Sequence, residues 1–347
     1  MISSFKLFTI LVLIIIYLYQ AKINWFISLI IFITKYLKQN YIIFIDSSGI
    51  NSIYGPGSFL KGIYQVLPFI NKKCIFVSKG FIKYFNNYFQ PDFYYNPSSN
   101  IKENQFRQLL DKKIINKYIL GPNFVPNLWF NFPDSKLWKE KHFSEILNSV
   151  KGIVIHSVRV RDFLAQKSNN TNSLRKFIIM RPCTNLKPKV INSFEDRKID
   201  IIFFEKYMDL NRIEQGKELL KLFKLTKKKI VILKYGHYNK KIMNDLANDS
   251  KFIIYFSFYD TGAIGLKEIQ NYGVFAFTHQ KDLVICNETT FHIPELETIN
   301  NINLAAKKIL EIIENVSKKN PKSELIAEKN QKVNKCENAL NDLCKRL

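Results

Sequence analysis

Residues 252–268 read Phe-Ile-Ile-Tyr-Phe-Ser-Phe-Tyr-Asp-Thr-Gly-Ala-Ile-Gly-Leu-Lys-Glu, and this stretch decides the predicted fold. Its first five residues form a short apolar run that polar residues follow, which is typical of a buried strand. The periodicity predicts a helix over 264–271 and a further strand over 274–277. Strands with little internal polarity, joined by short helices, indicate a parallel sheet that is covered on both faces.

The same alternation continues outward from this stretch in both directions. The second half is expected to hold further strands at 200–204 and 230–233 and helices at 212–224, 239–248 and 302–318. The first half is expected to hold strands at 41–46, 74–78, 117–120, 152–156 and 177–180. Between the halves, residues 181–198 contain two prolines and many charges without apolar periodicity, which predicts a linker.

The chain is therefore predicted to be an α/β protein with two Rossmann-like lobes. Ligands of such sheets bind beyond the carboxyl ends of the strands, so two facing lobes imply a cleft between them. The expected organisation is a membrane anchor over 1–38, an N-terminal lobe over 39–180, a linker over 181–197, a C-terminal lobe over 198–318 and a polar C-terminal tail over 319–347.

The N-terminal segment is strongly apolar. Residues 7–21 carry no charge, Lys22 interrupts the run, and a second apolar stretch covers 23–34. A span needs about 20 apolar residues, and a lysine that snorkels to the interface makes that length reachable. We expect an N-terminal hydrophobic helix that is a single-pass anchor, located in an endomembrane such as the ER or Golgi if the source is eukaryotic. A cleaved signal peptide and a soluble buried helix are the alternatives, and the side of the membrane is left open.

The composition restricts the partners. The formal net charge is +23, yet only eight of the 52 basic residues are arginine. One interpretation is a biased composition, and another is attraction to anionic lipids or to a pyrophosphate-bearing substrate. Nucleic acid is not expected as a partner, because neither zinc-finger spacing nor an RNA-binding aromatic motif is present. The five scattered cysteines contain no Cys-x-x-Cys pair, so we expect neither a zinc site nor a disulfide framework.

Two acidic residues separated by seven others are the candidate centre of a binding site. Asp260 follows the strand over 252–256, and Glu268 lies about two turns into the next helix. Thr261 and Gly262 suit a helix start, where exposed N–H groups and the helix dipole favour an anion such as phosphate. The Glu268 carboxylate can accept both hydroxyls of a ribose, while Asp260 can hold sugar hydroxyls. The alternative is an ordinary helix cap with a solvent-facing glutamate.

This stretch resembles the donor-site motif of retaining GT-B glycosyltransferases of the group-1 type, which are related to glycogen and sucrose synthases. The resemblance implies that Glu268 binds the nucleotide ribose and that Asp260 contacts the transferred sugar. The sequence departs from the pattern, with Asp at the first acidic position and Thr-Gly where the family often has Gly-Phe. No Asp-x-Asp triplet occurs in the chain, which favours a two-lobed enzyme that needs no metal and no cofactor beyond its nucleotide-sugar co-substrate.

The resemblance also indicates further site residues. In that family, basic residues after the first strand of the C-terminal lobe neutralise the donor diphosphate, and Lys206 and Arg212 are the candidates here. Family members also have a glycine-rich loop close to the donor after the first strand of the N-terminal lobe. In this chain the corresponding segment contains Gly55 and Gly57. His156 ends a strand of the N-terminal lobe and could orient substrate or transfer a proton.

The expected function is transfer of a sugar from a nucleotide-sugar donor, held by the C-terminal lobe, to a glycan, lipid or protein acceptor at the N-terminal lobe. Asp260, His156 and Lys206 are the candidate catalytic residues. One alternative is a catalytically inactive GT-B-like membrane scaffold or subunit. Another is an epimerase that acts on nucleotide sugars.

Overall fold

The computed structural model describes residues 41–45, 55–66, 74–78, 92–97, 108, 110–122, 140–167, 171–184, 186–206, 210–257, 263–284 and 286–347. The predicted anchor over 1–38 lies outside these residues. Within them, no helix combines the length and the apolar character that crossing a bilayer requires.

The N-terminal lobe is built on a parallel sheet that has six strands within the described residues, in the order β2-β1-β3-β4-β5-β6. Its strands are β1 (Tyr41–Ile45), β2 (Cys74–Ser78), β3 (Phe93–Asn96), β4 (Tyr118–Leu120), β5 (Gly152–Ile155) and β6 (Phe177–Ile179). Its helices are α3 (Gly55–Val66), α7 (Glu140–Ser149) and α8 (Val158–Lys167), with 3-10 turns at Ile115–Lys117 and Thr171–Lys176. The expected parallel α/β arrangement is confirmed for this lobe.

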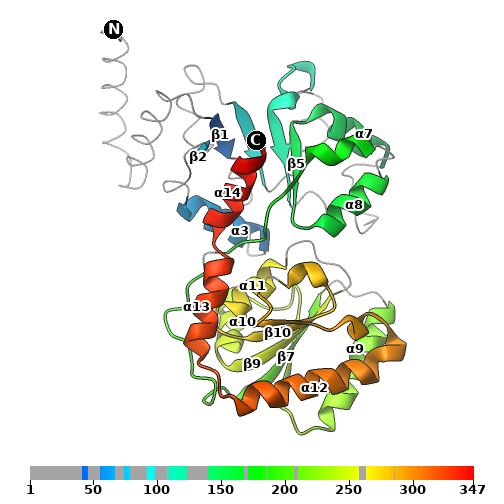
Figure 1. Ribbon diagram of the computed structural model, residues 1–347, viewed down its shortest axis with the longest axis vertical. Helices are drawn as coiled ribbons and strands as arrows, with labels where there is room; N and C mark the ends of the chain where they lie inside the picture. The colour runs from blue at the N-terminus through cyan, green and yellow to red at the C-terminus, as the bar shows by residue number, and fades with distance from the viewer. Residues whose placement is uncertain are drawn as a thin grey trace.

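The C-terminal lobe is built on a second parallel sheet, with five strands in the described residues and the order β11-β10-β9-β7-β8. Its strands are β7 (Ile199–Lys206), β8 (Ile230–Lys234), β9 (Ser250–Ser257), β10 (Phe275–Thr278) and β11 (Thr290–His292). Its helices are α9 (Leu210–Lys224), α10 (Lys240–Asn248), α11 (Ile264–Gln270) and α12 (Ile302–Lys318), with 3-10 turns at Lys281–Leu283, Pro294–Glu297 and Ile299–Asn301. Figure 1 shows this lobe below the N-terminal lobe along the long axis.

Two apolar layers sandwich the C-terminal sheet. Phe203, Phe252 and Phe256 point to the side that α9 and α12 cover. Tyr255 and Leu266 belong to the opposite layer, under α10 and α11. Successive residues of a strand point to opposite faces, so an uninterrupted apolar run such as 252–256 supplies both layers. This is why the run predicted a buried strand correctly.

The strand orders locate where each sheet can bind a ligand. In the C-terminal sheet the chain passes from β7 to β8 on one side and then returns to β9 on the other, so the order reverses between β7 and β9. The N-terminal sheet has the same reversal between β1 and β3. Loops diverge at such a switch point and leave a crevice beyond the strands. The predicted interlobe cleft would be lined partly by residues 46–54 and 258–262, which are outside the described part of the chain, so it stays a prediction.

The end of the chain, which was predicted to be a polar tail, is folded into two helices. Residues expected to form that tail make α13 (Ser323–Val333) and α14 (Cys336–Arg346). Figure 1 shows α13 climbing along the C-terminal lobe and α14 reaching the N-terminal lobe. There Leu340 and Leu343 are buried in the core cluster that also contains Ile43 of β1 and Phe59 of α3. The apolar residues of this segment are spaced at helical intervals. They are outnumbered by Lys, Asn and Glu residues, so the composition of the segment is polar and predicted a tail.

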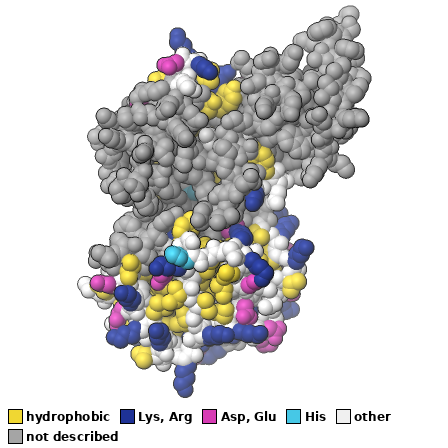
Figure 2. Space-filling view, turned by 180° about the vertical axis from the view of Figure 1, so that it is seen from behind, with side chains coloured by type: hydrophobic (Ala, Val, Ile, Leu, Met, Phe, Trp, Pro, Cys, Tyr) yellow, Lys and Arg dark blue, Asp and Glu magenta, His cyan; other side chains and the backbone are white. Residues whose placement is uncertain are grey.

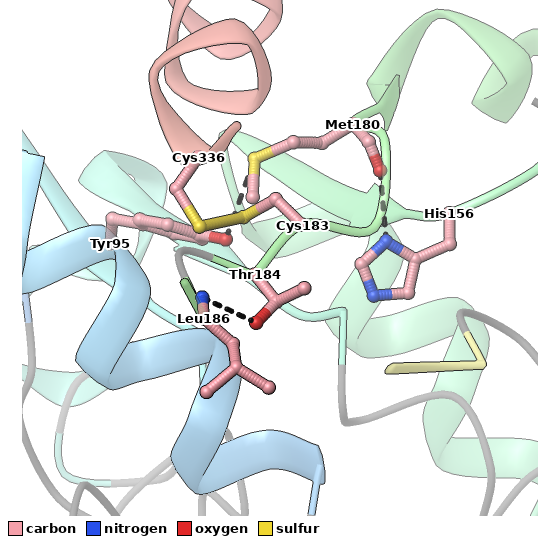
Figure 3. Close-up of a disulfide and its surroundings, with 7 residues drawn as sticks. All are labelled: Tyr95, His156, Met180, Cys183, Thr184, Leu186 and Cys336. Atoms are coloured by element: carbon pink, nitrogen blue, oxygen red, sulfur yellow. Dashed lines mark hydrogen bonds between the residues drawn. A yellow bond between two sulfur atoms is a disulfide. The ribbon is translucent and has the colours of Figure 1, made fainter. Parts of the chain in front are cut away.

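A disulfide between Cys183 and Cys336 fastens the linker to the start of α14 (Figure 3). None was expected, because the two cysteines are 153 residues apart and sequence spacing carries no information about such a pair. Cys286, in the C-terminal lobe, is a free thiol.

Gly273 and Arg197 hold the C-terminal lobe to α13 and to the linker. Gly273 has φ +80°, and a Cβ there would lie 2.3 Å from the backbone oxygen of Ser323, so only glycine allows this close approach. Arg197 is buried and donates to the carbonyls of Ser250, Tyr272 and Gly273. Burial lowers the pKa of Arg197 to about 10, although the negative charge of Asp249 acts to raise it.

Candidate active site

The carboxyl ends of β7 and β9 lie side by side at the switch point of the C-terminal sheet. Lys206, the last residue of β7, is the register partner of Ser257, the last residue of β9. Ser257 is fully buried, and its hydroxyl has no hydrogen-bond partner among the described residues. The next residues, 258–262, lie outside the described part of the chain. The predicted sugar contact Asp260 and the predicted phosphate residues Thr261 and Gly262 are therefore not placed.

Lys206 lies at this strand end, and its predicted role at the diphosphate stays a prediction. Its Nζ is 4.8 Å from the centroid of the Tyr235 ring, a cation–π contact. Tyr235 follows β8, and its N–H donates to the carbonyl of Glu205 at 2.9 Å. The neighbouring strand end therefore supports the lysine side chain beside the switch point.

Glu268 is buried, with an exposed fraction of 4%. Its Oε1 forms an ion pair with Nζ of Lys240, the first residue of α10. Burial raises the pKa of Tyr272 above its ordinary value, and the negative charges of Asp245 and Glu268 add to the effect. The alternative of a solvent-facing glutamate is wrong, because this carboxylate is withdrawn from water and has a cationic partner.

The helix that carries Glu268 packs directly on the end of β7. A Cβ at Gly265 would lie 3.4 Å from Cε1 of Phe204 and 3.8 Å from the hydroxyl of Tyr238. The rings of Phe204 and Tyr238 meet edge to face, with centroids 5.8 Å apart. Because Phe204 is two residues before Lys206, this contact brings the elements that carry Lys206 and Glu268 to one corner of the lobe.

Arg212 is buried in the first turn of α9, with an exposed fraction of 4%. It donates to Oε1 of Gln215 at 2.8 Å, to the carbonyl of Leu296, and to Nε2 of His279 at 2.9 Å. Its guanidinium carbon also lies 4.9 Å from the ring centroid of Phe256. Both terminal nitrogens thus have protein acceptors, which ties Arg212 to the interior of the lobe.

His156 follows β5 directly and is almost fully buried. Its Nδ1 lies 2.8 Å from the carbonyl oxygen of Met180, as Figure 3 shows. A carbonyl oxygen only accepts, so Nδ1 carries a hydrogen in this contact. Phe59 of α3 packs edge-on against this ring, with centroids 5.6 Å apart.

Gly55 and Gly57 lie in the first turn of α3, not in a loop as expected. The same helix carries Phe59 and Ile63, which share one core cluster with Ile264, the first residue of α11. Helices α3 and α11 therefore pack across the two lobes. The structure thus brings together the helix that contains the two glycines and the helix that contains Glu268.

A second contact between the lobes was not anticipated. Nη2 of Arg159, in α8, donates to Oε1 of Gln280 at 3.0 Å, and Gln280 follows β10. Both residues come shortly after strands β5 and β10. A search for polar residues just beyond strand ends would have found them, as it would have found Tyr235 and Tyr238 after β8.

The charge is spread over the C-terminal lobe. On the face seen in Figure 2, apolar side chains gather in the middle of the lobe, and Lys, Arg, Asp and Glu side chains lie around them. Within the described residues, no group of three or more His, Cys, Asp or Glu side chains is placed to hold a metal ion.

Comparison with known proteins establishes the fold. No protein-family profile matches the sequence, and no curated protein matches it. An alpha-glucosyltransferase solved with UDP and a 13-mer DNA containing an HMU base is similar, with a TM-score of 0.53 and 10% identity over 88% of this chain and 99% of that one. Sucrose-phosphate synthase from Thermosynechococcus elongatus is similar with a TM-score of 0.51 and 9% identity, over 88% and 97%. The predicted resemblance to GT-B glycosyltransferases is confirmed at the level of the fold.

Proposed function

We propose that this protein is a glycosyltransferase that moves a sugar from a nucleotide-sugar donor to a glycan, lipid or protein acceptor. The observation that carries the proposal is the buried Glu268 carboxylate, which lies on the helix after β9 and beside the end of β7. A buried carboxylate with one cationic partner at a sheet switch point is suited to accept neighbouring hydroxyls, such as those of a ribose. The fold shared with the alpha-glucosyltransferase solved with UDP and with sucrose-phosphate synthase supports the same proposal.

Each candidate residue has a role in this proposal. Glu268 accepts the ribose hydroxyls, and Lys206 stabilises the negative charge that develops on the diphosphate as the glycosidic bond breaks. Arg212 adds a positive charge from within the lobe. We assign the transferred sugar to Asp260 and the phosphates to Thr261 and Gly262.

The N-terminal lobe contributes the remaining groups. The glycines at the start of α3, Gly55 and Gly57, allow close backbone approach to the donor. We assign His156, at the end of β5, the role of orienting the substrate or transferring a proton. Retention of the anomeric configuration, and transfer without metal or cofactor, are part of the proposal by resemblance to the retaining group-1 enzymes.

The test is a screen of nucleotide sugars with the purified protein over residues 39–347. Binding by calorimetry and release of free nucleotide would be measured for UDP- and GDP-sugars, with and without glycan, lipid, protein and DNA acceptors. Donor-dependent transfer or hydrolysis is the expected result. If no nucleotide sugar binds or turns over, the proposal fails. A nucleotide sugar that is isomerised without any acceptor would instead indicate an epimerase.

An inactive scaffold is the second candidate. It is favoured by the departures at Asp260 and Thr261 and by the engagement of Arg212 with protein acceptors. Tight nucleotide binding with no turnover on any acceptor would support it over the enzyme.

We also propose that residues 1–38 anchor the protein to a membrane. The support is their apolar sequence. Full-length protein should stay with membranes after alkaline extraction, whereas residues 39–347 should be released. Release of both would contradict the anchor.

A further inference from the structure

The ion pair between Glu268 and Lys240 joins two helices that cover the same face of the C-terminal sheet. Glu268 belongs to α11 and Lys240 to α10, and the two helices lie side by side. The Glu268 side chain is 5% exposed, whereas that of Lys240 is 37% exposed. A buried carboxylate is costly unless a counter-charge and hydrogen bonds satisfy it. Lys240 supplies that counter-charge from the rim of the site.

The helix that carries Lys240 does not explain its position. Lys240 is the first residue of α10, where the partial positive charge of the helix dipole disfavours a cation. Asn239 already caps this end, since its side chain accepts from the N–H of Ile242 at 2.9 Å. The next lysine, Lys241, forms an ordinary exposed pair with Asp245 one turn further on, at 2.9 Å. Of these two lysines, Lys240 is the one that pairs with α11.

The turn before α10 brings Lys240 to the candidate site. It runs from Tyr235 to Lys240 and contains Gly236 at φ +83°, a left-handed conformation that favours glycine. Tyr235 meets Lys206, and the Tyr238 hydroxyl lies near Gly265, one turn before Glu268. One short turn therefore contacts the strand that ends in Lys206 and the helix that carries Glu268.

A carboxylate that binds two adjacent hydroxyls must be held in one direction. It offers about four lone-pair positions on two oxygens, and Lys240 uses Oε1. We propose that Lys240 is a positioning residue for the donor site, which fixes the Glu268 carboxylate so that it accepts the ribose hydroxyls of a nucleoside diphosphate. This inference rests on the proposed function. The new element is the role of Lys240, which we assign to ribose recognition through Glu268.

The experiment separates the ribose contact from every other contact. Calorimetry on the wild type first identifies which of UDP, ADP and GDP binds most tightly. That nucleotide and its 2′,3′-dideoxy analogue are then measured with the wild type, Lys240→Met, Lys240→Arg and the matched control Lys241→Met. The dideoxy analogue lacks the hydroxyls that Glu268 would bind, so it reports whether Lys240 acts through them.

We expect the wild type to bind the dideoxy analogue about 10- to 100-fold more weakly, the range for hydrogen bonds to a charged group. Lys240→Met should weaken binding of the parent nucleotide about 10-fold and leave the analogue within about twofold, because that contact is already lost. Lys240→Arg should restore most of the affinity. Lys241→Met should change neither ligand.

Equal weakening of both ligands by Lys240→Met would overturn the inference, because the lysine would then act on the phosphates or on the fold. An unchanged affinity for the parent nucleotide would overturn it too. A failure of the wild type to bind any of the three nucleotides would overturn the proposed function together with this inference. Lys240→Met leaves the buried Glu268 carboxylate without its counter-charge, so its unfolding temperature should fall. Unfolding temperatures that stay above the temperature of the calorimetry show that the comparison is between folded proteins.

Discussion

The two lobes share one architecture but differ in what completes their cores. In the C-terminal lobe, β7 and β9 are eight residues long, and the residues between β7 and α12 supply nearly all of the buried aromatic layer. In the N-terminal lobe the strands have three to five residues. Its core is completed by α14, which arrives from the far end of the chain and buries Leu340 and Leu343 against β1 and α3.

This difference indicates that the two lobes are stabilised in different ways. The C-terminal lobe has a nearly self-contained core, which suits the proposed donor site, where Glu268 and Lys206 would have to keep fixed positions. The N-terminal lobe depends on the linker and on α14, which the disulfide between Cys183 and Cys336 joins. Its stability therefore depends on the far end of the chain, so experiments can change the stability of one lobe without changing that of the other.

Removal of residues 335–347 should have the largest effect. It deletes α14 and exposes the core that Leu340 and Leu343 complete, and each buried leucine lost costs about 2–5 kcal/mol. We expect β1 and β6 to lose hydrogen-exchange protection while β7 and β9 keep theirs. Equal loss in both sheets would contradict the self-contained C-terminal lobe, and no loss in either would contradict the role of α14.

Removal of the disulfide should come next. The Cys183→Ser and Cys336→Ser variants each remove a cross-link that spans 153 residues. The larger conformational entropy of the unfolded chain should then lower the free energy of unfolding by at most about 5 kcal/mol. The exchange of amides in β6 and α14 should speed up, and that of β9 should not. Cys286→Ser is the matched control, because Cys286 is a free thiol of the C-terminal lobe. An identical response to all three substitutions would argue against the tether.

A pair of leucine substitutions sharpens the comparison further. Leu340 and Leu219 are both fully buried, the first in the N-terminal core and the second in the C-terminal core. Each change to Ala should cost about 3 kcal/mol, from lost transfer energy and a residual cavity. Urea unfolding with exchange readout should place the loss of Leu340→Ala in the N-terminal lobe and that of Leu219→Ala in the C-terminal lobe. The comparison breaks if Leu340→Ala destabilises the C-terminal sheet instead.

Glu268→Ala should have the smallest effect on the fold and a specific effect on binding. Loss of the ribose contact should weaken nucleotide binding by about 1.5–3 kcal/mol, the range for hydrogen bonds to charged groups. Glu288→Ala, which removes an exposed partner of Lys329, is the control and should leave affinity unchanged. Calorimetric titration measures both, and an unaltered affinity in Glu268→Ala would remove the ribose assignment.

Much of the site region could be predicted because its signal is local. The apolar run at 252–256, the helix that carries Glu268 and the strand at 274–277 follow one another within 26 residues, and periodicity reports such short-range order directly. Lys240 was missed for the opposite reason. It is 28 residues before Glu268, and nothing in its own segment signals that its ammonium turns toward α11.

The sequence by itself determined the alternation of strands and helices, the two lobes and the burial of the central strands, because hydrophobic pattern and chain direction specify these locally. Only the tertiary structure decided which distant groups meet. It placed α14 in the N-terminal core, joined Cys183 to Cys336 and paired Glu268 with Lys240. Such contacts depend on how whole elements pack, and residues far apart in the chain carry no local mark of their eventual partners.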